Sequence, residues 1–361
     1  MSGRPVSGRP HVLVARQDSM GDVLLAGPAV RAVAAGAGRV TLLAGPVGRE
    51  AAALLPGVDE VLIWAAPWID PEPGPLLRGD VELLVGMVAA CRPDQAIVLT
   101  SFHQTPLPLA LLLRLAGVAT IAAISVDYPG ALLDVRHRVD DEVHEVERGL
   151  SLAEALGYRL PAGDDGRLAV RRPGGGAAPP AAGRYVAVHP GASVPARAWP
   201  AARHAELAAA LARLGWEVVV TGNAAEQSLT AEVAAAAGGR GADLGGRLDL
   251  AGLAEVLAGA AVLVAGNTGP AHLAAAVDTP VVSLFSPVVP AVRWRPWKIP
   301  HILLGDQWAA CAGTRARDCP VPDHPCLNEI GVGEVLAAVD RLAACPRLPA
   351  EPAAAAPAEA G

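Results

Sequence analysis

The chain has 361 residues, of which 52% are hydrophobic, and a formal net charge of -7. This length is enough for two α/β domains of ordinary size, and the composition excludes a disordered chain. The negative charge argues against a general nucleic-acid binder, which would carry a basic surplus. Arginine far outnumbers lysine, so any anion site is expected to use guanidinium groups or backbone N–H groups.

The N-terminal residues 1–11 contain two arginines but no apolar core of a signal peptide. The most apolar window, 106–123, contains Pro108 and Arg114 and is typical of a buried helix followed by a strand rather than of a membrane span. Five cysteines without a secretion signal predict reduced thiols. Together these features predict a cytoplasmic protein.

Short β-branched runs alternate with longer Ala/Leu-rich stretches, a pattern typical of parallel sheets with helices on both faces. In the first half we predict helices over 76–91, 105–116 and 142–156, and strands over His11–Ala15, Val40–Ala44, Val61–Trp64, Gln95–Leu99 and Thr120–Ile124.

The run RRPGGGAAPPAAGR, residues 171–184, is too rich in Gly and Pro to continue a helix or a central strand, and it predicts a linker. The alternation then restarts, with strands over 185–189, 217–221, 262–265 and 280–285 and helices over 201–214, 225–237, from 269 onward and over 332–344. We therefore predict domains over 1–170 and 185–345 and a disordered tail over 346–361. Two such halves create a cleft at the carboxyl ends of their strands, where ligands bind.

The sequence contains neither G-x-G-x-x-G after a strand nor G-x-x-x-x-G-K-[ST]. The common dinucleotide and P-loop signatures are therefore missing, which weakens a dehydrogenase or kinase interpretation.

Asp22 follows the first predicted strand, at the start of a helix and next to Gly21. A carboxylate there faces the cleft and could accept a proton from an alcohol. The alternative is helix chemistry alone, because an acidic first turn is favoured by the helix dipole, with Asp18 or Ser19 as the cap.

Two loops of the second half also follow strands directly. In AGNTGPAHLAAA, residues 265–276, free N–H groups, the Thr268 hydroxyl and Gly269 could cradle a diphosphate; the alternative is an ordinary capped helix with His272 in the core. In HPGASVPARAWP, residues 189–200, Ser193 offers a hydroxyl and Arg197 a fixed positive charge for phosphate, or Arg197 forms only a surface salt bridge.

From about His11 to Ala344 the chain resembles glycosyltransferase family nine, the heptosyltransferase family. The resemblance rests on DSMGDVLLAGPAVRA, on HPGASVPARAWP with TGNAAE, and on GNTGPAHLAAA followed by TPVVSLFSP, in this order across both halves. It implies an α/β protein of the GT-B type, with two Rossmann-like domains whose parallel sheets face a central cleft.

The resemblance also implies roles for individual residues. Asp22 matches the catalytic base of the family. Donor-binding positions are matched by Ser193, Arg197, Glu226 near the nucleoside, Leu248 beside the base, Asn267, Thr268, Gly269 and His272. Many members carry Lys where this chain has Arg197, and Asp where it has Asn267, which removes a negative charge beside the phosphates.

The implied activity is inverting, metal-independent transfer of a heptose or related sugar, with no cofactor, from a nucleotide diphosphate donor to a cell-envelope glycan or lipid-linked acceptor. We expect this donor to be ADP-linked. We expect no nucleic-acid partner and allow a peripheral contact with the inner face of the cell membrane. Two alternatives stay open: a GT-B-type nucleotide-sugar epimerase, and an inactive nucleotide-sugar-binding relative.

Two further segments carry chemistry-bearing residues. A loop near the C-terminus contains a weak candidate set of metal ligands without a tight C-x₂-C spacing, namely Cys311, Cys319, His324 and Cys326. The run RWRPWK, residues 293–298, is either a packed loop or a contact with acceptor or anionic headgroups.

Overall fold

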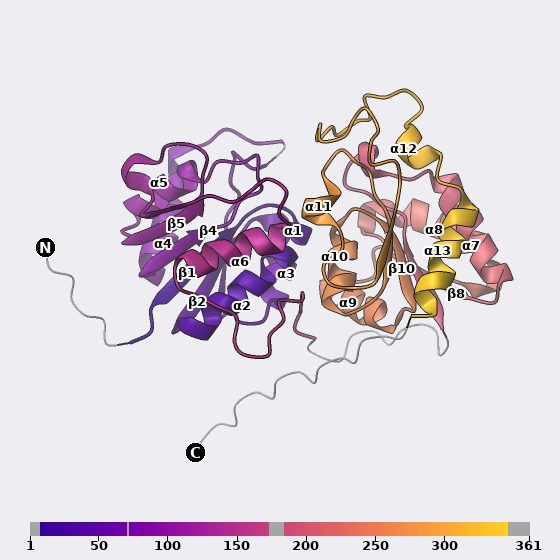
Figure 1. The fold of residues 1–361 in the computed structure, drawn as a ribbon, viewed down its shortest axis with the longest axis horizontal. Helices are drawn as coiled ribbons and strands as arrows, with labels where there is room; N and C mark the ends of the chain where they lie inside the picture. The colour runs from indigo at the N-terminus through magenta and orange to yellow at the C-terminus, as the bar shows by residue number, and fades with distance from the viewer. Residues whose placement is uncertain (1–7, 71, 173–183, 346–361) are drawn as a thin grey trace, which may run out of the picture.

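The computed structural model describes residues 8–70, 72–172 and 184–345. They form two α/β halves that lie side by side, the N-terminal half in indigo to magenta and the C-terminal half in pink to yellow (Figure 1). Each half contains one six-stranded parallel sheet. None of the described helices is long and apolar enough to cross a membrane.

The first sheet has the strand order β3-β2-β1-β4-β5-β6, which is the 3-2-1-4-5-6 order of a Rossmann-like fold. Its strands are β1 (His11–Arg16), β2 (Arg39–Ala44), β3 (Glu60–Ile63), β4 (Gln95–Val98), β5 (Thr120–Ile124) and β6 (Val135–His137). Its α-helices are α1 (Met20–Leu25), α2 (Gly27–Gly36), α3 (Arg49–Leu54), α4 (Arg78–Cys91), α5 (Leu107–Leu115) and α6 (Glu145–Ala155).

The second sheet, β12-β11-β10-β7-β8-β9, repeats the same order when its strands are counted from β7. Its strands are β7 (Tyr185–His189), β8 (Glu217–Val220), β9 (Gly241–Asp243), β10 (Val262–Gly266), β11 (Val281–Leu284) and β12 (His301–Leu304). Its α-helices are α7 (Ala201–Arg213), α8 (Gln227–Ala236), α9 (Leu250–Gly259), α10 (Gly269–Ala276), α11 (Ala291–Trp294), α12 (Pro325–Asn328) and α13 (Val332–Ala343).

Three hydrophobic clusters hold these layers together. One lies under α4 and α5 on the outer face of the first sheet, and a second lies under α7, α8 and α13 on the outer face of the second sheet. The third is continuous between the halves and joins residues of α1, α2 and α6 to residues of α9 and α10. The halves therefore share a core where they meet.

The predicted strands of the two sheet centres are all present, within one residue at either end. The short edge strands β6, β9 and β12 were not predicted, because three or four residues give no readable alternation. The helix predicted from 142 begins at Glu145, since the His144 backbone is extended and its ring accepts a hydrogen bond from the Val146 N–H as the cap. The predicted linker 171–184 and tail 346–361 lie almost wholly outside the described residues.

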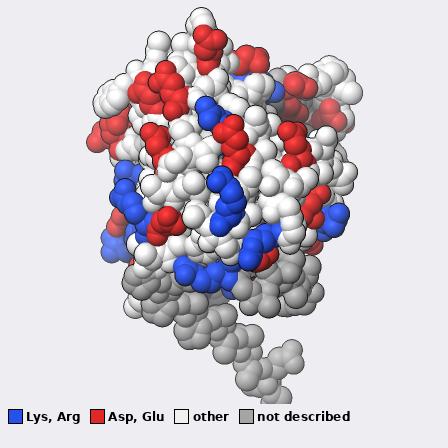
Figure 2. Space-filling model, turned by 90° about the vertical axis from the view of Figure 1, so that its right-hand side faces the viewer, with Lys and Arg blue, Asp and Glu red and all other residues white. Residues whose placement is uncertain are grey.

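The end of the molecule formed by the C-terminal half carries both signs of charge on its described residues (Figure 2). Acidic side chains lie mostly in the upper part of this view and basic side chains mostly in the lower part.

Candidate active site

The predicted site residues follow the strands at the topological switch point of each sheet. In the first sheet the order reverses between β1 and β4, and in the second between β7 and β10. Asp22 follows β1, Arg197 follows β7, and Thr268 follows β10. Ligands of open α/β sheets bind in the crevice at this point, so the topology places these loops where a ligand is expected.

Asp22 is the third residue of α1, and its carboxylate is held by three donors. Oδ2 accepts a hydrogen bond from the Ser19 hydroxyl at 2.7 Å. Oδ1 accepts one from Arg16 Nη2 at 2.9 Å and one from Trp294 Nε1 at 3.2 Å. The side chain is 15% exposed, so the carboxylate is fixed in place and still reaches the surface of the site.

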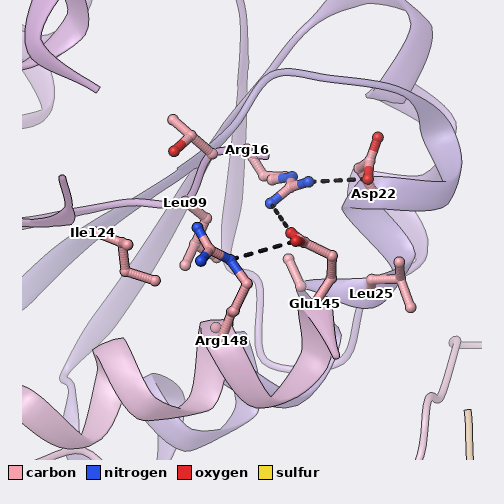
Figure 3. Close-up of a pocket in the computed structure, with 10 residues that line it drawn as sticks. Arg16, Asp22, Leu25, Leu99, Ile124, Glu145 and Arg148 are labelled. Carbon is pink, nitrogen blue, oxygen red and sulfur yellow. Dashed lines mark hydrogen bonds and ion pairs between the residues drawn. The ribbon is translucent and has the colours of Figure 1, made fainter. Parts of the chain in front are cut away.

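Arg16, the last residue of β1, is buried at the centre of a charge network (Figure 3). Besides Asp22 it pairs with Asp18 at 3.1 Å and with Glu145 Oε2 at 3.4 Å. Glu145 in turn pairs with Arg148 at 3.4 Å. A cavity with about 280 Å³ of empty space, including open solvent, borders this network, and Asp22 forms part of its wall.

Burial alone would raise the pKa of Asp22, but Arg16, the Ser19 hydroxyl, the Trp294 N–H and His272 together hold it below its usual value. Burial raises the pKa of Asp18, and the negative charge of Asp22 adds to that effect against the attraction of Arg16. Two neighbouring carboxyl groups are thus driven apart in acidity, which is typical of functional sites. The lowered pKa of Asp22 favours its ionised form.

Helix α10 presents its N-terminus to this carboxylate. Thr268 is its N-cap residue, and no side chain of the described residues caps the helix. A Cβ on Gly269 would lie 2.1 Å from Met20 Cε, and one on Gly21 would lie 2.9 Å from His272 Cδ2, so α1 and α10 approach where only glycine fits. The start of α10 therefore faces the base across the boundary between the halves.

Arg197 and His272 complete this centre. Burial lowers the pKa of Arg197, which feels the charges of Asp22 and Arg315 and has no ion pair among the described residues. Burial also lowers the pKa of His272 to about 4, so this imidazole is neutral at neutral pH. The Arg197 Nε and His272 Nδ1 atoms are buried without a hydrogen-bond partner in the described part of the chain. Arg197 is therefore a candidate for contact with an anion.

The remaining donor-site candidates also lie at this edge of the second sheet, but they are grouped less closely than the residues named so far. Ser193 is exposed in the loop after β7. The Glu226 carboxylate overlies Gly191, lies 3.9 Å from His189 and accepts a hydrogen bond from the Asn223 N–H. Leu248 packs beside Gly252 at the start of α9, and Asn267 is buried and exchanges hydrogen bonds with the Ser286 backbone. The structure thus unites Asp22, Arg197, Thr268, Gly269 and His272 and leaves these four around them.

The cysteine loop does not form a metal site: among the described residues no group of three or more His, Cys, Asp or Glu side chains could hold a metal ion. All five cysteines are free thiols. Burial, with the neighbouring Cys311, raises the pKa of Cys326 to about 11. The Cys326 thiol is therefore protonated at neutral pH.

Of the two predicted cap candidates, Ser19 is the N-cap of α1 and donates to Asp22, but sequence reasoning missed the other partners of this carboxylate. Arg16 and Glu145 lie in no recognised motif, and they meet only because β4, β5 and α6 return to the edge where β1 ends. Trp294 belongs to the aromatic-basic run that was singled out, but nothing in the sequence placed it on the opposite half. The sequence signal that could have indicated Arg16 is its position as a charged residue at the end of a strand.

Comparison with known proteins identifies the family. The family model described as glycosyltransferase family 9 (heptosyltransferase) matches residues 91–322, which is more than half of the chain. Lipopolysaccharide heptosyltransferase 1 of Pseudomonas aeruginosa is 43% identical over 155 residues, which are 41% of this chain and 41% of that protein. The chain thus matches less than half the length of this curated relative.

Solved structures agree on the fold over a greater length. A glycosyl transferase of family 9 from Veillonella parvula has a TM-score of 0.73 at 17% identity, covering 92% of this chain and 97% of that one. The E. coli heptosyltransferase WaaC, solved with ADP-2-deoxy-2-fluoro heptose, has a TM-score of 0.66 at 21% identity, covering 92% and 99%. These likenesses confirm the predicted GT-B architecture, and with the family match they show that the chain belongs to glycosyltransferase family 9, the heptosyltransferase family.

Proposed function

We propose that this protein transfers a heptose or related sugar from an ADP-linked donor to a hydroxyl of a cell-envelope glycan or lipid-linked acceptor, with inversion and without a metal. The proposal rests on one observation: an ionised carboxylate lies near a cation that has no ion pair, and a helix N-terminus that has no side-chain cap, among the described residues. Asp22 belongs to the first half. It faces Arg197 and the uncapped start of α10, which both belong to the second half. The ADP donor follows the E. coli relative solved with an ADP-heptose analogue.

In this proposal the first half, residues 1–170, holds the acceptor and the second half, residues 185–345, holds the donor. Asp22 Oδ2 accepts one hydrogen bond, from Ser19, and keeps a lone pair for the acceptor hydroxyl. The acceptor oxygen forms a bond to the anomeric carbon while its proton passes to Asp22. The bond from that carbon to the diphosphate breaks, and its electron pair leaves with the nucleotide.

The second half stabilises the charge that develops on the leaving group. Arg197 and the N–H groups at the start of α10 supply positive potential where that charge grows. Ser193 and Thr268 add hydroxyl donors, and Glu226 and Leu248 flank the nucleoside in this assignment. Exclusion of water by the packed halves protects the donor from hydrolysis. A lipid-linked acceptor would bring the protein to the inner face of the cell membrane.

The first experiment compares the wild type with Asp22→Asn across ADP-, GDP-, UDP- and dTDP-sugars in the presence of a chelator. We expect one donor to turn over and the variant to lose about 10²–10⁴-fold in kcat, the contribution of a placed general base. Nucleotide affinity, measured by calorimetry, is expected to persist, because Asp22 is proposed to act on the acceptor.

Asp80→Asn is the matched control. Asp80 is also the third residue of a helix, and its carboxylate accepts a hydrogen bond from the cap residue Leu77, but it is exposed and belongs to α4. If Asp22 were only a helix-capping residue, both variants would keep full activity. Tight nucleotide binding without turnover of any donor would favour an inactive binding protein, and conversion of the donor sugar without an acceptor would favour an epimerase.

A further inference from the structure

One segment of the second half packs against the first half. Helix α11 and the residues up to Lys298 leave the end of β11, and Figure 1 shows α11 at the boundary on the side of α1. The Trp297 N–H donates to the Gly166 carbonyl at 2.8 Å, and the His144 ring stacks on Trp297 at a centroid distance of 4.4 Å. The aromatic-basic run is thus a packed segment that joins the halves.

Arg293 anchors this segment by charge. Its side chain is 3% exposed and pairs with Asp141 at 2.9 Å and with Glu145 Oε1 at 3.5 Å. The guanidinium also lies 4.2 Å from the centre of the Phe102 ring. Because Glu145 also pairs with Arg16, the anchor reaches the charge network that holds Asp22.

Trp294, the next residue, contacts Asp22 directly. Its indole N–H donates to Oδ1, the same oxygen that accepts from Arg16. The ring also lies 5.8 Å, centre to centre, from the ring of Phe102. The Oδ1 atom of Asp22 is therefore held by one donor from its own half, Arg16, and by one from the opposite half, Trp294.

We propose that Trp294 is a positioning residue that fixes the Asp22 carboxylate only while α11 is packed against the first half. This inference rests on the proposed function, because it concerns the base of that reaction. The N–H fixes Oδ1 and leaves Oδ2 directed at the acceptor. Separation of the halves removes the Trp294 bond and the Arg293 pairs together, so the base loses its working position whenever the site is open.

The bond also biases the ionisation of the carboxylate. A donor to the charged form favours that form, so its removal raises the pKa of Asp22. The other groups that interact with Asp22 stay in place and continue to favour or oppose the ionised form; they are Arg16, Asp18, Ser19, Arg197, His103 and His272. The acid limb of the pH profile therefore moves to higher pH without Trp294.

The experiment compares Trp294→Phe with Trp297→Phe. Both remove an indole N–H that joins the halves, but only Trp294 contacts Asp22. We expect Trp294→Phe to lower kcat about tenfold to a hundredfold, the usual worth of a hydrogen bond to a charged group, with donor KM within about twofold. In Trp294→Phe the acid limb of the kcat profile should move to higher pH by up to about one unit, whereas Trp297→Phe should leave it in place.

A second replacement, β-(3-benzothienyl)alanine at position 294, keeps the bicyclic shape and removes only the N–H. It should reproduce the fall in kcat and the shifted limb even if Phe at this position alters packing. The inference is overturned if this variant keeps the wild-type kcat and pH profile while Asp22→Asn is inactive. If the wild type and Asp22→Asn turn over every donor equally, the proposed function fails instead, and the two failures are thus separate.

Discussion

The carboxyl edges of the two sheets have the same topology and opposite chemistry. At the edge of the first sheet the charges are paired: Arg16 meets three carboxylates, and Glu145 meets three arginines. At the edge of the second sheet Arg197 has no ion pair among the described residues, and α10 begins without a side-chain cap. The charges of the first edge are therefore balanced by protein groups, including Arg293 of the second half, whereas Arg197 at the second edge has no such partner among the described residues.

This difference fits the division of labour proposed above. A base must be fixed before the substrate arrives, so protein groups orient it: Arg16 and Ser19 of its own half and Trp294 of the other half. An anion brings its own charge, so the half that binds it must leave donors free and accept the cost of burying them. Substitutions at the first edge and at the second edge should therefore differ in their effects on stability and on turnover.

The largest expected effect is on stability, from Glu145→Gln. The side chain of Glu145 is 1% exposed and neutralises Arg16, Arg148 and Arg293, so its removal leaves buried positive charge. Breaking such a pair typically costs about 3–5 kcal/mol. We expect this loss in the free energy of unfolding measured with urea.

The surface pair Arg203–Glu206 supplies the control. Its side chains are 44% and 57% exposed, and exposed pairs contribute about 0.2–1 kcal/mol. Glu206→Gln should therefore leave the urea midpoint almost unchanged. Equal effects of the two substitutions would show that the network at the first edge is not a source of stability.

The next effect separates turnover from stability, in Arg197→Met. Loss of one preorganised donor to a developing charge costs about 10²–10³-fold in kcat. Stability should stay the same or rise, because the substitution removes a buried cation without an ion pair among the described residues. Steady-state kinetics test the expected loss in kcat, and urea unfolding of the same preparation tests the expected stability.

Arg203→Met, on the exposed face of α7, is the matched arginine control and should change neither quantity. Lysine at 197 retains the charge and should recover part of the lost activity. An Arg197→Met variant that unfolds more easily and turns over normally would mean that Arg197 is a structural residue.

These contrasts also mark what could be predicted from sequence. Both sheets, their central strands and the loops bearing Asp22, Arg197 and Thr268 were predicted, because buried parallel strands leave a β-branched signal and site loops follow them directly. The bond between Asp22 and Trp294 was not, since a contact over 272 residues depends on how the halves pack. The pair with Arg16, which lies 6 residues earlier in the chain, was missed because Arg16 lies in no recognised motif. Local patterns reveal where chemistry-bearing residues lie along the chain, and tertiary packing decides which of them meet.

The smallest effect concerns pH and distinguishes the neutral interior of the second half from the ionised network of the first. Burial lowers the pKa of His204 to about 3, from 6.5, in a site where the ring packs edge-on against Trp199. The unfolded chain therefore binds a proton that the folded chain excludes, so stability is full above pH 6.5 and falls as the pH drops toward 3. At pH 5 this histidine alone should cost about 2 kcal/mol.

His204→Gln should remove that share of the slope, and unfolding free energies measured at pH 7, 6 and 5 would show it as a flatter line than in the wild type. The Asp22 carboxylate does not contribute in this window, because its pKa is held below the ordinary value of 3.8 and its pairs are lost only under more acidic conditions. An unchanged slope in His204→Gln would mean that the ring has the same pKa in the folded and unfolded chain and is therefore charged at pH 5 in the folded protein. The second half would then contain a buried cation in its core, and the contrast between the two edges would no longer extend to the interior.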